Sequence, residues 1–324
     1  MKKALKVLLY LVLAFVIIII GVISYVTLFL PNVGKPEDIT IERTPERIER
    51  GRYLANSVTV CMDCHSTRDW SKFSGPLTPG TEGKGGERFD QSVGFPGVFY
   101  SRNITPANLS NWTDGEIFRT VTTGVDKNGK ALFPVMPYHY YGQLDREDIY
   151  SIIAYIRTLK PIENTVLVPK PDFPFSIIEH LIPHKANFQK RPAENDTINY
   201  GKYIITASGC VECHTKVEKG QIITGLEFGG GREFNLPWGT VRSANITSDG
   251  NGIKTWTADM FVARFKQYTD STYKSPTMGP KDFNSIMPWT MYAHMKESDL
   301  RAIYAYLRTV KKQSFKVEKF TPAK

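Results

Sequence analysis

The four cysteines of this 324-residue chain all fall into one pattern, Cys-x-x-Cys-His, which occurs at residues 61–65 and again at 210–214. Two thiols at this spacing on one helical turn can each form a thioether with a vinyl group of a haem. The adjacent imidazole then lies under the porphyrin and binds the iron. A redox-active cysteine pair does not need the histidine, and a zinc site needs four ligands, whereas these two pairs lie far apart in the sequence.

The sequence therefore predicts two covalently bound haem c groups, each with its own iron. We expect the thioethers to form at Cys61 and Cys64 for the first haem and at Cys210 and Cys213 for the second. The expected proximal iron ligands are His65 and His214.

A methionine is expected as the second axial ligand of each iron. Met136 and Met287 each precede a proline and an aromatic residue, and they occupy matching positions after the two cysteine patterns. Methionine more often fills a core than binds a metal, but this recurrence favours a ligand role. His139 is the alternative in the first copy, and Met291 and Met295 are the alternatives in the second.

The two cysteine patterns belong to two copies of a longer pattern, about 150 residues apart, which is the size of a domain. The matched segments are 51–54 with 201–204, 101–105 with 243–247, 112–113 with 256–257, 135–138 with 286–289 and 154–158 with 305–309. We expect an N-terminal anchor or signal peptide at 1–35, a cytochrome c domain at 36–160, a proline-rich linker at 161–195 and a second cytochrome c domain at 196–324.

Each copy shows a helical pattern at both of its ends. Pro45 favours the start of a helix that runs to about residue 57, and isoleucines recur at helical spacing over 149–156. Leucine and isoleucine recur in the same way over 300–307. We expect these apolar faces to pack on the helix before each cysteine pair. No alternating strand pattern stands out, so the expected fold class is all-α, with one short apolar turn in the linker at 175–182.

An uncharged, mostly apolar run covers residues 7–30 and follows Lys2, Lys3 and Lys6. As a helix it is ~36 Å long, enough to cross a hydrocarbon core of ~30 Å. The lysines place the N-terminus in the cytoplasm. A signal peptide cleaved near Ser24 is the alternative, and either interpretation exports the rest of the chain.

The formal net charge is +9, but no basic stripe interleaved with aromatic residues is present, so nucleic-acid binding is not expected. The repeated Asn103 and Thr105, matched by Asn245 and Thr247, allow two interpretations. They could line a haem edge or bind a propionate, or they could be ordinary turn residues.

The order of these motifs resembles that of the multihaem cytochrome c subunits of bacterial membrane-bound alcohol and gluconate dehydrogenases, over about residues 45–312. The resemblance implies all-α cytochrome c domains that relay electrons from a catalytic partner toward quinone or a terminal acceptor. It also implies that His65 and Met136 hold one haem iron and that His214 and Met287 hold the other. Those subunits usually carry three haem domains, whereas this chain has two cysteine patterns and an N-terminal apolar segment.

The expected function is electron relay, without a catalytic residue, by a single-pass protein of the inner membrane whose haem domains face the periplasm. The expected redox partners are a membrane dehydrogenase, a quinol-oxidising complex or a terminal oxidase. Two catalytic alternatives are a dihaem peroxidase with one open haem and an enzyme that oxidises a small sulfur compound. A methionine ligand in each copy would favour the relay.

Overall fold

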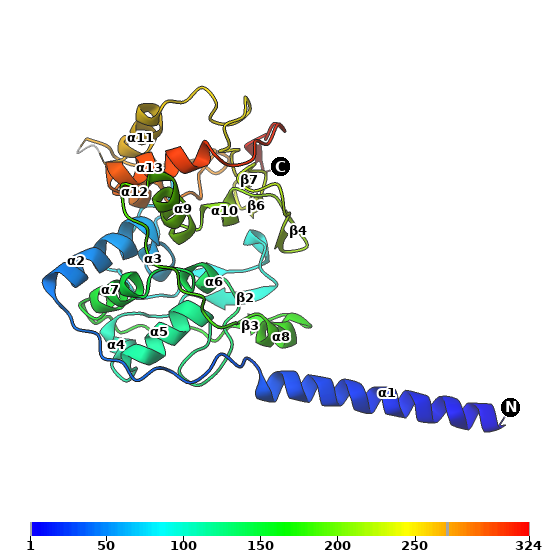
Figure 1. Cartoon of the computed structure of the whole chain (residues 1–324). Coiled ribbons are helices and arrows are strands. Elements are labelled where there is room, and N and C mark those ends of the chain that lie inside the picture. Colours follow the sequence, from blue (N-terminus) through cyan, green and yellow to red (C-terminus); the bar gives the residue numbers. More distant parts are fainter. Residues whose placement is uncertain (1, 270–271, 324) are drawn as a thin grey trace.

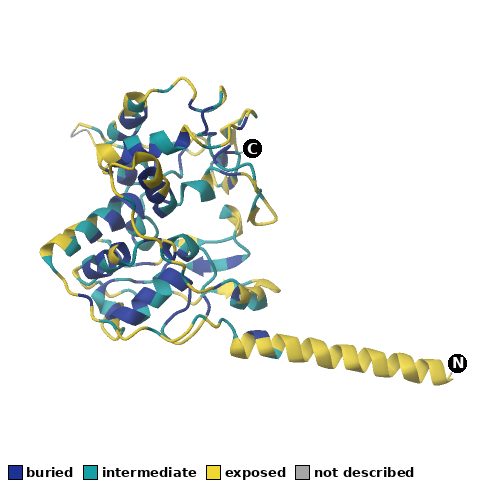
Figure 2. Cartoon of the chain, in the orientation of Figure 1, coloured by how far each residue is buried: buried dark blue, intermediate teal, exposed yellow. Residues whose placement is uncertain are grey.

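The computed structural model describes residues 2–269 and 272–323 of the chain. Helix α1 (Lys2–Phe29) projects away from the remaining elements (Figure 1). Figure 2 shows that it is exposed along almost its whole length, and Val26 is its one buried residue among those described. By length and composition α1 can cross a membrane. Below, the N-terminal half means residues 36–160, the connecting segment 161–195 and the C-terminal half 196–323.

The N-terminal half contains the expected helix at Pro45. The hydroxyl of Thr44 accepts a hydrogen bond from the Arg47 backbone N–H, which caps the helix. Pro45 has no backbone N–H, and this costs nothing in the first turn because an N–H there would have no partner within the helix. The helix continues into a π-helical turn, so the prediction to about residue 57 is confirmed. The helices of this half are α2 (Pro45–Tyr53), η1 (Leu54–Val58), α3 (Cys61–His65), η2 (Gln91–Val93), α4 (Pro106–Leu109), α5 (Asp114–Thr123), α6 (Tyr138–Tyr141) and α7 (Arg146–Ile156).

The C-terminal half repeats the order of α2, α3, α5, α6 and α7, and its described residues contain no counterpart of η1, η2 or α4. Asp196 caps the helix that leads to the second cysteine pair by accepting a hydrogen bond from the Asn199 backbone N–H. The helices of this half are α9 (Thr197–Ala207), α10 (Cys210–Cys213), α11 (Ala258–Lys266), α12 (Trp289–Tyr292) and α13 (Glu297–Leu307). The connecting segment holds α8 (Phe175–Ile178) and η3 (Glu179–Leu181), which confirms the predicted short turn.

In each half, the helix before the cysteine pair packs against the last helix of the same half, as expected. Helix α2 lies against α7, and α9 lies against α13. The approach is close: a Cβ at Gly51 would lie 1.7 Å from the Ser151 carbonyl oxygen, and one at Gly201 would lie 2.0 Å from that of Ala302. Only glycine fits there, which explains the glycine of the repeated Gly-x-Tyr motif at 51–53 and 201–203. One cluster of buried apolar side chains runs through both halves.

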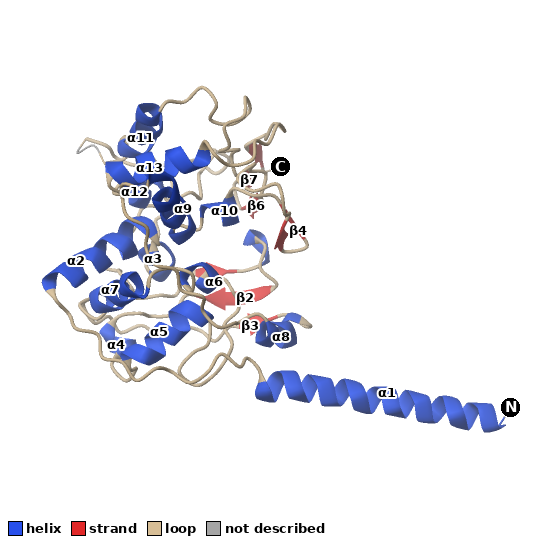
Figure 3. Ribbon diagram, viewed as in Figure 1, coloured by secondary structure: helices blue, strands red, loops and turns tan. Residues whose placement is uncertain are grey.

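The prediction of an all-α fold is wrong, because the structure contains three small antiparallel sheets (Figure 3). Their strands have two to four residues, too few to display an alternating pattern. Two of the sheets also pair segments that are far apart in the sequence, such as Val98 with Lys170 and Thr240 with Thr321. The strands are β1 (Arg88–Phe89), β2 (Gly97–Tyr100) and β3 (Lys170–Pro171) in the first sheet, β4 (Val217–Glu218) and β5 (Gln221–Ile222) in the second, and β6 (Glu233–Leu236), β7 (Gly239–Arg242) and β8 (Phe320–Pro322) in the third.

Candidate haem-binding sites

Both cysteine patterns lie on short helices that begin after a left-handed residue. Val60 has φ of 43° before α3, and Gly209 has φ of 61° before α10. A valine in this conformation is strained, and such strain is concentrated at functional sites. The turn separates each attachment helix from the long helix that precedes it, so both cysteines of a pair lie on a single helical turn.

Each predicted proximal histidine is held by one backbone carbonyl. Nδ1 of His65 lies 2.7 Å from the oxygen of Arg102, and Nδ1 of His214 lies 2.7 Å from that of Ala244. A carbonyl only accepts, so Nδ1 carries the hydrogen and Nε2 keeps its lone pair for a metal. Burial lowers the pKa of both histidines, which favours this neutral form. These are the properties of an iron ligand.

The Asn-Ile-Thr motif holds the carbonyl that orients each histidine, because it follows that carbonyl directly. Asn103 Oδ1 accepts hydrogen bonds from the backbone N–H and the hydroxyl of Thr105, and its Nδ2 donates to the Ile162 carbonyl. Asn245 makes the same bonds to Thr247, with Gln313 supplying the carbonyl. Of the two interpretations, these bonds favour turn residues over a haem-edge or propionate role.

This positioning role was not expected from the sequence. The available signal was that the motif occurs once after each cysteine pattern, but the bond from histidine to carbonyl joins segments 30 or more residues apart.

A cavity of about 240 Å³ in the C-terminal half brings several predicted site residues together. Cys210, His214 and Met287 line it, together with mainly apolar side chains. A porphyrin is a largely apolar ring that binds a metal, so the mainly apolar lining and the free Nε2 of His214 suit the chemistry of a haem. Met295 also lines the cavity, whereas Met291 is buried but does not line it. Cys213 is exposed and does not line the cavity either.

In the N-terminal half, Cys61 and Met136 both pack against the apolar core. The Cys61 sulfur lies 3.2 Å from the hydroxyl of Thr59, and Cys64 is half-buried nearby on the same short helix. Met62, between the two cysteines, is fully buried and belongs to the core.

His139, the alternative ligand, faces the other half of the molecule. Its Nε2 lies 3.3 Å from Oε1 of Glu212, which also accepts a hydrogen bond of 2.8 Å from the Tyr140 hydroxyl. Burial opposes ionisation of Glu212, but these bonds and the charge of Arg232 hold its pKa below the ordinary value. Because Glu212 lies between Cys210 and Cys213, an ionised carboxylate is fixed beside the second attachment site.

Of the other histidines, His180 and His184 lie against backbone carbonyls. Nδ1 of His180 lies 3.2 Å from the Leu30 carbonyl oxygen, and that of His184 lies 3.3 Å from the oxygen of Ile182. For His294, burial lowers the pKa and the neighbouring Lys266 lowers it further.

The thiols do not resemble a redox-active or zinc-binding set. Burial raises the pKa of Cys61 and of Cys64, and it raises the pKa of Cys210 to about 12, so these thiols stay neutral near pH ~7. Among the described residues, no group of three or more His, Cys, Asp or Glu side chains could hold a metal ion. Thioether formation needs neither a thiolate in the finished protein nor a ligand cluster.

No protein-family model matches the chain. It is 30% identical to the fructose dehydrogenase cytochrome subunit of Gluconobacter japonicus, over 81% of this chain and 52% of that protein. It is 25% identical to the gluconate 2-dehydrogenase cytochrome c subunit of Pantoea cypripedii, over 81% of this chain and 59% of that one. The cytochrome c subunit of the quinone alcohol dehydrogenase of Gluconacetobacter polyoxogenes is also 25% identical, with 81% and 56% covered.

The chain thus spans little more than half the length of these relatives. The paired Cys-x-x-Cys-His segments, the oriented histidines and these matches agree in one conclusion. The chain is similar to the cytochrome c subunits of fructose, gluconate and alcohol dehydrogenases.

Proposed function

We propose that this protein is a membrane-tethered c-type cytochrome that relays electrons through two covalently attached haem c groups. The observation that carries the proposal is the repeated proximal geometry, in which His65 and His214 each commit Nδ1 to a backbone carbonyl and keep Nε2 free. When bound, haem supplies an iron that exchanges one electron between its ferrous and ferric states.

The proposed haem sites use the residues predicted from the sequence. Cys61, Cys64, His65 and Met136 hold haem one, and Cys210, Cys213, His214 and Met287 hold haem two. The shared cavity of His214 and Met287 supports the second assignment. The first rests on the matching position of Met136 and on its packing against the same apolar core as Cys61. A methionine on each iron leaves no open position for a substrate, which favours relay over catalysis.

The proposed location is the inner membrane, with α1 as a single-pass anchor and both haem domains in the periplasm. Exposure of α1 and its apolar composition support the anchor. The lysines before it support a cytoplasmic N-terminus. The proposed domains are the predicted ones, 36–160 and 196–324, with 161–195 as their linker.

A membrane dehydrogenase is the proposed electron donor. The similar proteins are named as cytochrome subunits of dehydrogenases for fructose, gluconate and alcohols, which supports a donor of this class. Tethering keeps the cytochrome at high local concentration beside other membrane proteins, so weak docking suffices for electron transfer.

The proposal is tested on the full chain, purified from a host that attaches haem c. We expect two haems per chain, a near-infrared band of methionine-bound ferric iron with an intensity for both, and no carbon monoxide binding after reduction. A single haem per chain would remove one assigned site. Carbon monoxide binding by the unaltered protein would reveal an open iron and support the peroxidase-like alternative instead of a relay.

A further inference from the structure

Exposed apolar side chains are concentrated in one part of the connecting segment, residues 167–181. Phe173 is 81% exposed and Val168 is 71% exposed. Outside α1 and this segment, the described residues expose only Ile198, Met260 and Phe283 as large apolar side chains. Scattered residues of that kind are ordinary, but a cluster on one stretch marks an interaction surface. The six members of the cluster are Leu167, Val168, Phe173, Phe175, Ile178 and Leu181.

This segment lies directly beside the end of the apolar helix. Both α8 and η3 contact α1, and Figure 1 shows α8 next to the C-terminal end of α1. Val26, in the last turns of α1, is buried. The His180 ring lies against the Leu30 carbonyl, with 3.2 Å between Nδ1 and the oxygen.

The length of α1 determines the level in the bilayer at which residues 167–181 lie. The apolar run of α1 is ~36 Å long and exceeds a hydrocarbon core of ~30 Å, so its last turn reaches the boundary with the headgroups. The side chains of α8 and η3 lie alongside that turn and are therefore at the same level. Apolar and aromatic side chains are favourable at this boundary, and the exposed Lys170 carries a charge that anionic lipid phosphates attract.

The segment is also fixed to the N-terminal half. Phe175 packs edge-on against Phe133, which stacks on Phe99 with 4.7 Å between ring centroids. The backbone N–H of Asp172 donates to the Pro96 carbonyl, and β3 pairs with β2. A lipid contact at 167–181 would therefore restrain the position of the N-terminal half relative to the membrane.

We propose that residues 167–181 form a second membrane contact, which lies in the phospholipid interface beside α1. The proposal rests on the proposed role of α1 as an anchor. One helix alone leaves the attached body free to swing, whereas a helix and a flanking apolar surface together set its orientation against the bilayer.

The test uses the full haem-loaded chain in phospholipid vesicles that contain a lipid with a photoactivatable diazirine near the glycerol. After illumination, lipid adducts are mapped by peptide mass spectrometry. We expect adducts on α1 and on 167–181, with a several-fold higher yield at 167–181 than around Met260 and Phe283, which are 50% and 40% exposed.

Labelled α1 with no excess at 167–181 would overturn the membrane contact and leave the anchor intact; a surface reserved for a protein partner would give this result. Unlabelled α1 would instead refute the anchor and, with it, the contact.

A pair of variants separates lipid contact from a change in fold. Val168→Ser with Leu181→Ser removes exposed apolar groups, so we expect a several-fold loss of adducts at 167–181 with unchanged labelling of α1 and an unchanged haem spectrum. The matched control, Met260→Ser with Phe283→Ser, should leave labelling at 167–181 as it was. Equal labelling of both double variants would contradict the proposal.

Discussion

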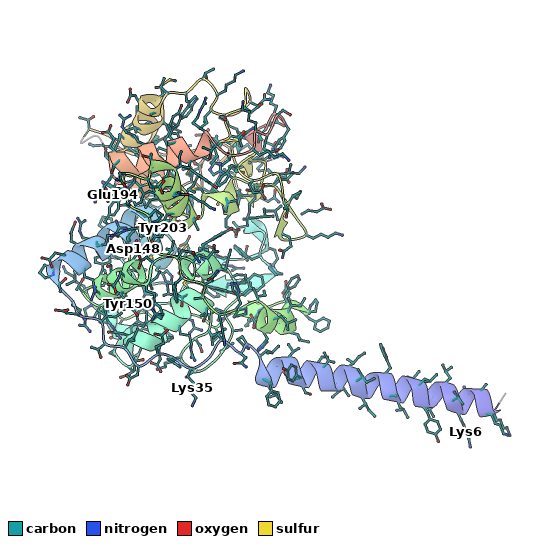
Figure 4. The ribbon with its side chains drawn as sticks, viewed as in Figure 1. Lys6, Lys35, Asp148, Tyr150, Glu194 and Tyr203 are labelled. Carbon is teal, nitrogen blue, oxygen red and sulfur yellow. The ribbon has the colours of Figure 1, made fainter. Side chains whose placement is uncertain are left out.

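Tyr203 in the C-terminal half donates a hydrogen bond of 2.7 Å from its hydroxyl to Oδ2 of Asp148 in the N-terminal half (Figure 4). The matched residues make the same contact with the two halves exchanged. The Tyr53 hydroxyl in the N-terminal half donates to Oδ2 of Asp299 in the C-terminal half at 2.6 Å. Each tyrosine comes from the Gly-x-Tyr motif of one copy, and each aspartate lies in the first turn of the last helix of the other.

The Tyr203→Phe variant should lower the free energy of unfolding by roughly 1–3 kcal/mol, because a buried carboxylate loses a donor. The Asp145 backbone N–H, which donates to the same hydroxyl at 3.1 Å, also loses its acceptor. Denaturant unfolding of the haem-loaded chain measures the loss. Tyr306→Phe is the control, since the Tyr306 hydroxyl makes no hydrogen bond to a side chain or carbonyl among the described residues. An equal loss in both variants would contradict the prediction.

Asp148 should contribute stability that is lost in acid. Burial disfavours its ionised form, but two hydrogen bonds from Arg50, at 3.0 and 2.9 Å, hold the pKa of Asp148 below its ordinary value. A lowered folded-state pKa stabilises the fold above the ordinary aspartate pKa, and this contribution disappears as pH falls below ~4 through the lower value. Asp148→Asn should cost about 3 kcal/mol at neutral pH, because Arg50 is left without its partner.

The difference in unfolding free energy between Asp148→Asn and the unaltered chain should therefore shrink on acidification. Unfolding curves from pH ~6 to ~3 would measure it. Asp259→Asn, which removes an exposed partner of Arg301, should leave stability almost unchanged at each of these pH values, because an exposed ion pair contributes little. A constant difference for Asp148→Asn would exclude the ion pair as the cause.

The iron ligand of the second site can be separated from its neighbour by two conservative variants. Met287→Leu and Met295→Leu each remove a sulfur from the cavity and keep an apolar side chain of similar volume. We expect Met287→Leu to halve the near-infrared methionine band and to open one reduced haem to carbon monoxide. Met295→Leu should do neither, and the reverse result would assign Met295 as the ligand.

Asn103→Leu should raise the reduction potential of haem one by tens of millivolts. The variant loosens the carbonyl that accepts from His65, and that hydrogen bond makes the imidazole a stronger donor to ferric iron. A redox titration followed by absorption would resolve the two potentials. Haem two serves as an internal control, and Asn245→Leu should produce the opposite pattern, with only haem two shifted.

Glu212→Gln should raise the potential of haem two, also by tens of millivolts. The half-buried carboxylate is held ionised next to Cys213 in the chain, and a fixed negative charge near the iron favours the ferric form. The control is Glu218→Gln on the exposed side of β4, which should leave both potentials in place. A shift of equal size in both variants would show that the effect is not local to the attachment helix.

Local sequence predicted the helices that have a first-turn proline or a strong apolar period, such as the one that begins at Pro45 and those that contain residues 149–156 and 300–307. It did not predict the sheets, because strands such as Gly239–Arg242 pair with a segment near the C-terminus. The cysteines and histidines of the proposed sites could be chosen from their spacing. The carbonyls of Arg102 and Ala244 were not, since no side-chain identity marks a carbonyl and the contact depends on tertiary structure.

The reciprocal tyrosine–aspartate contacts have the form of a symmetric homodimer interface, in which the same patch is used twice. Because both copies lie in one chain, the two sides of this interface can keep that geometry and still differ in sequence. In one copy, Arg50 is a charged partner of Asp148. The matching residue of the other copy is Tyr200, whose hydroxyl donates to Asp299 at 3.2 Å. The contact therefore keeps a two-fold form, while the unequal partners of Asp148 and Asp299 give the two halves different electrostatic surroundings.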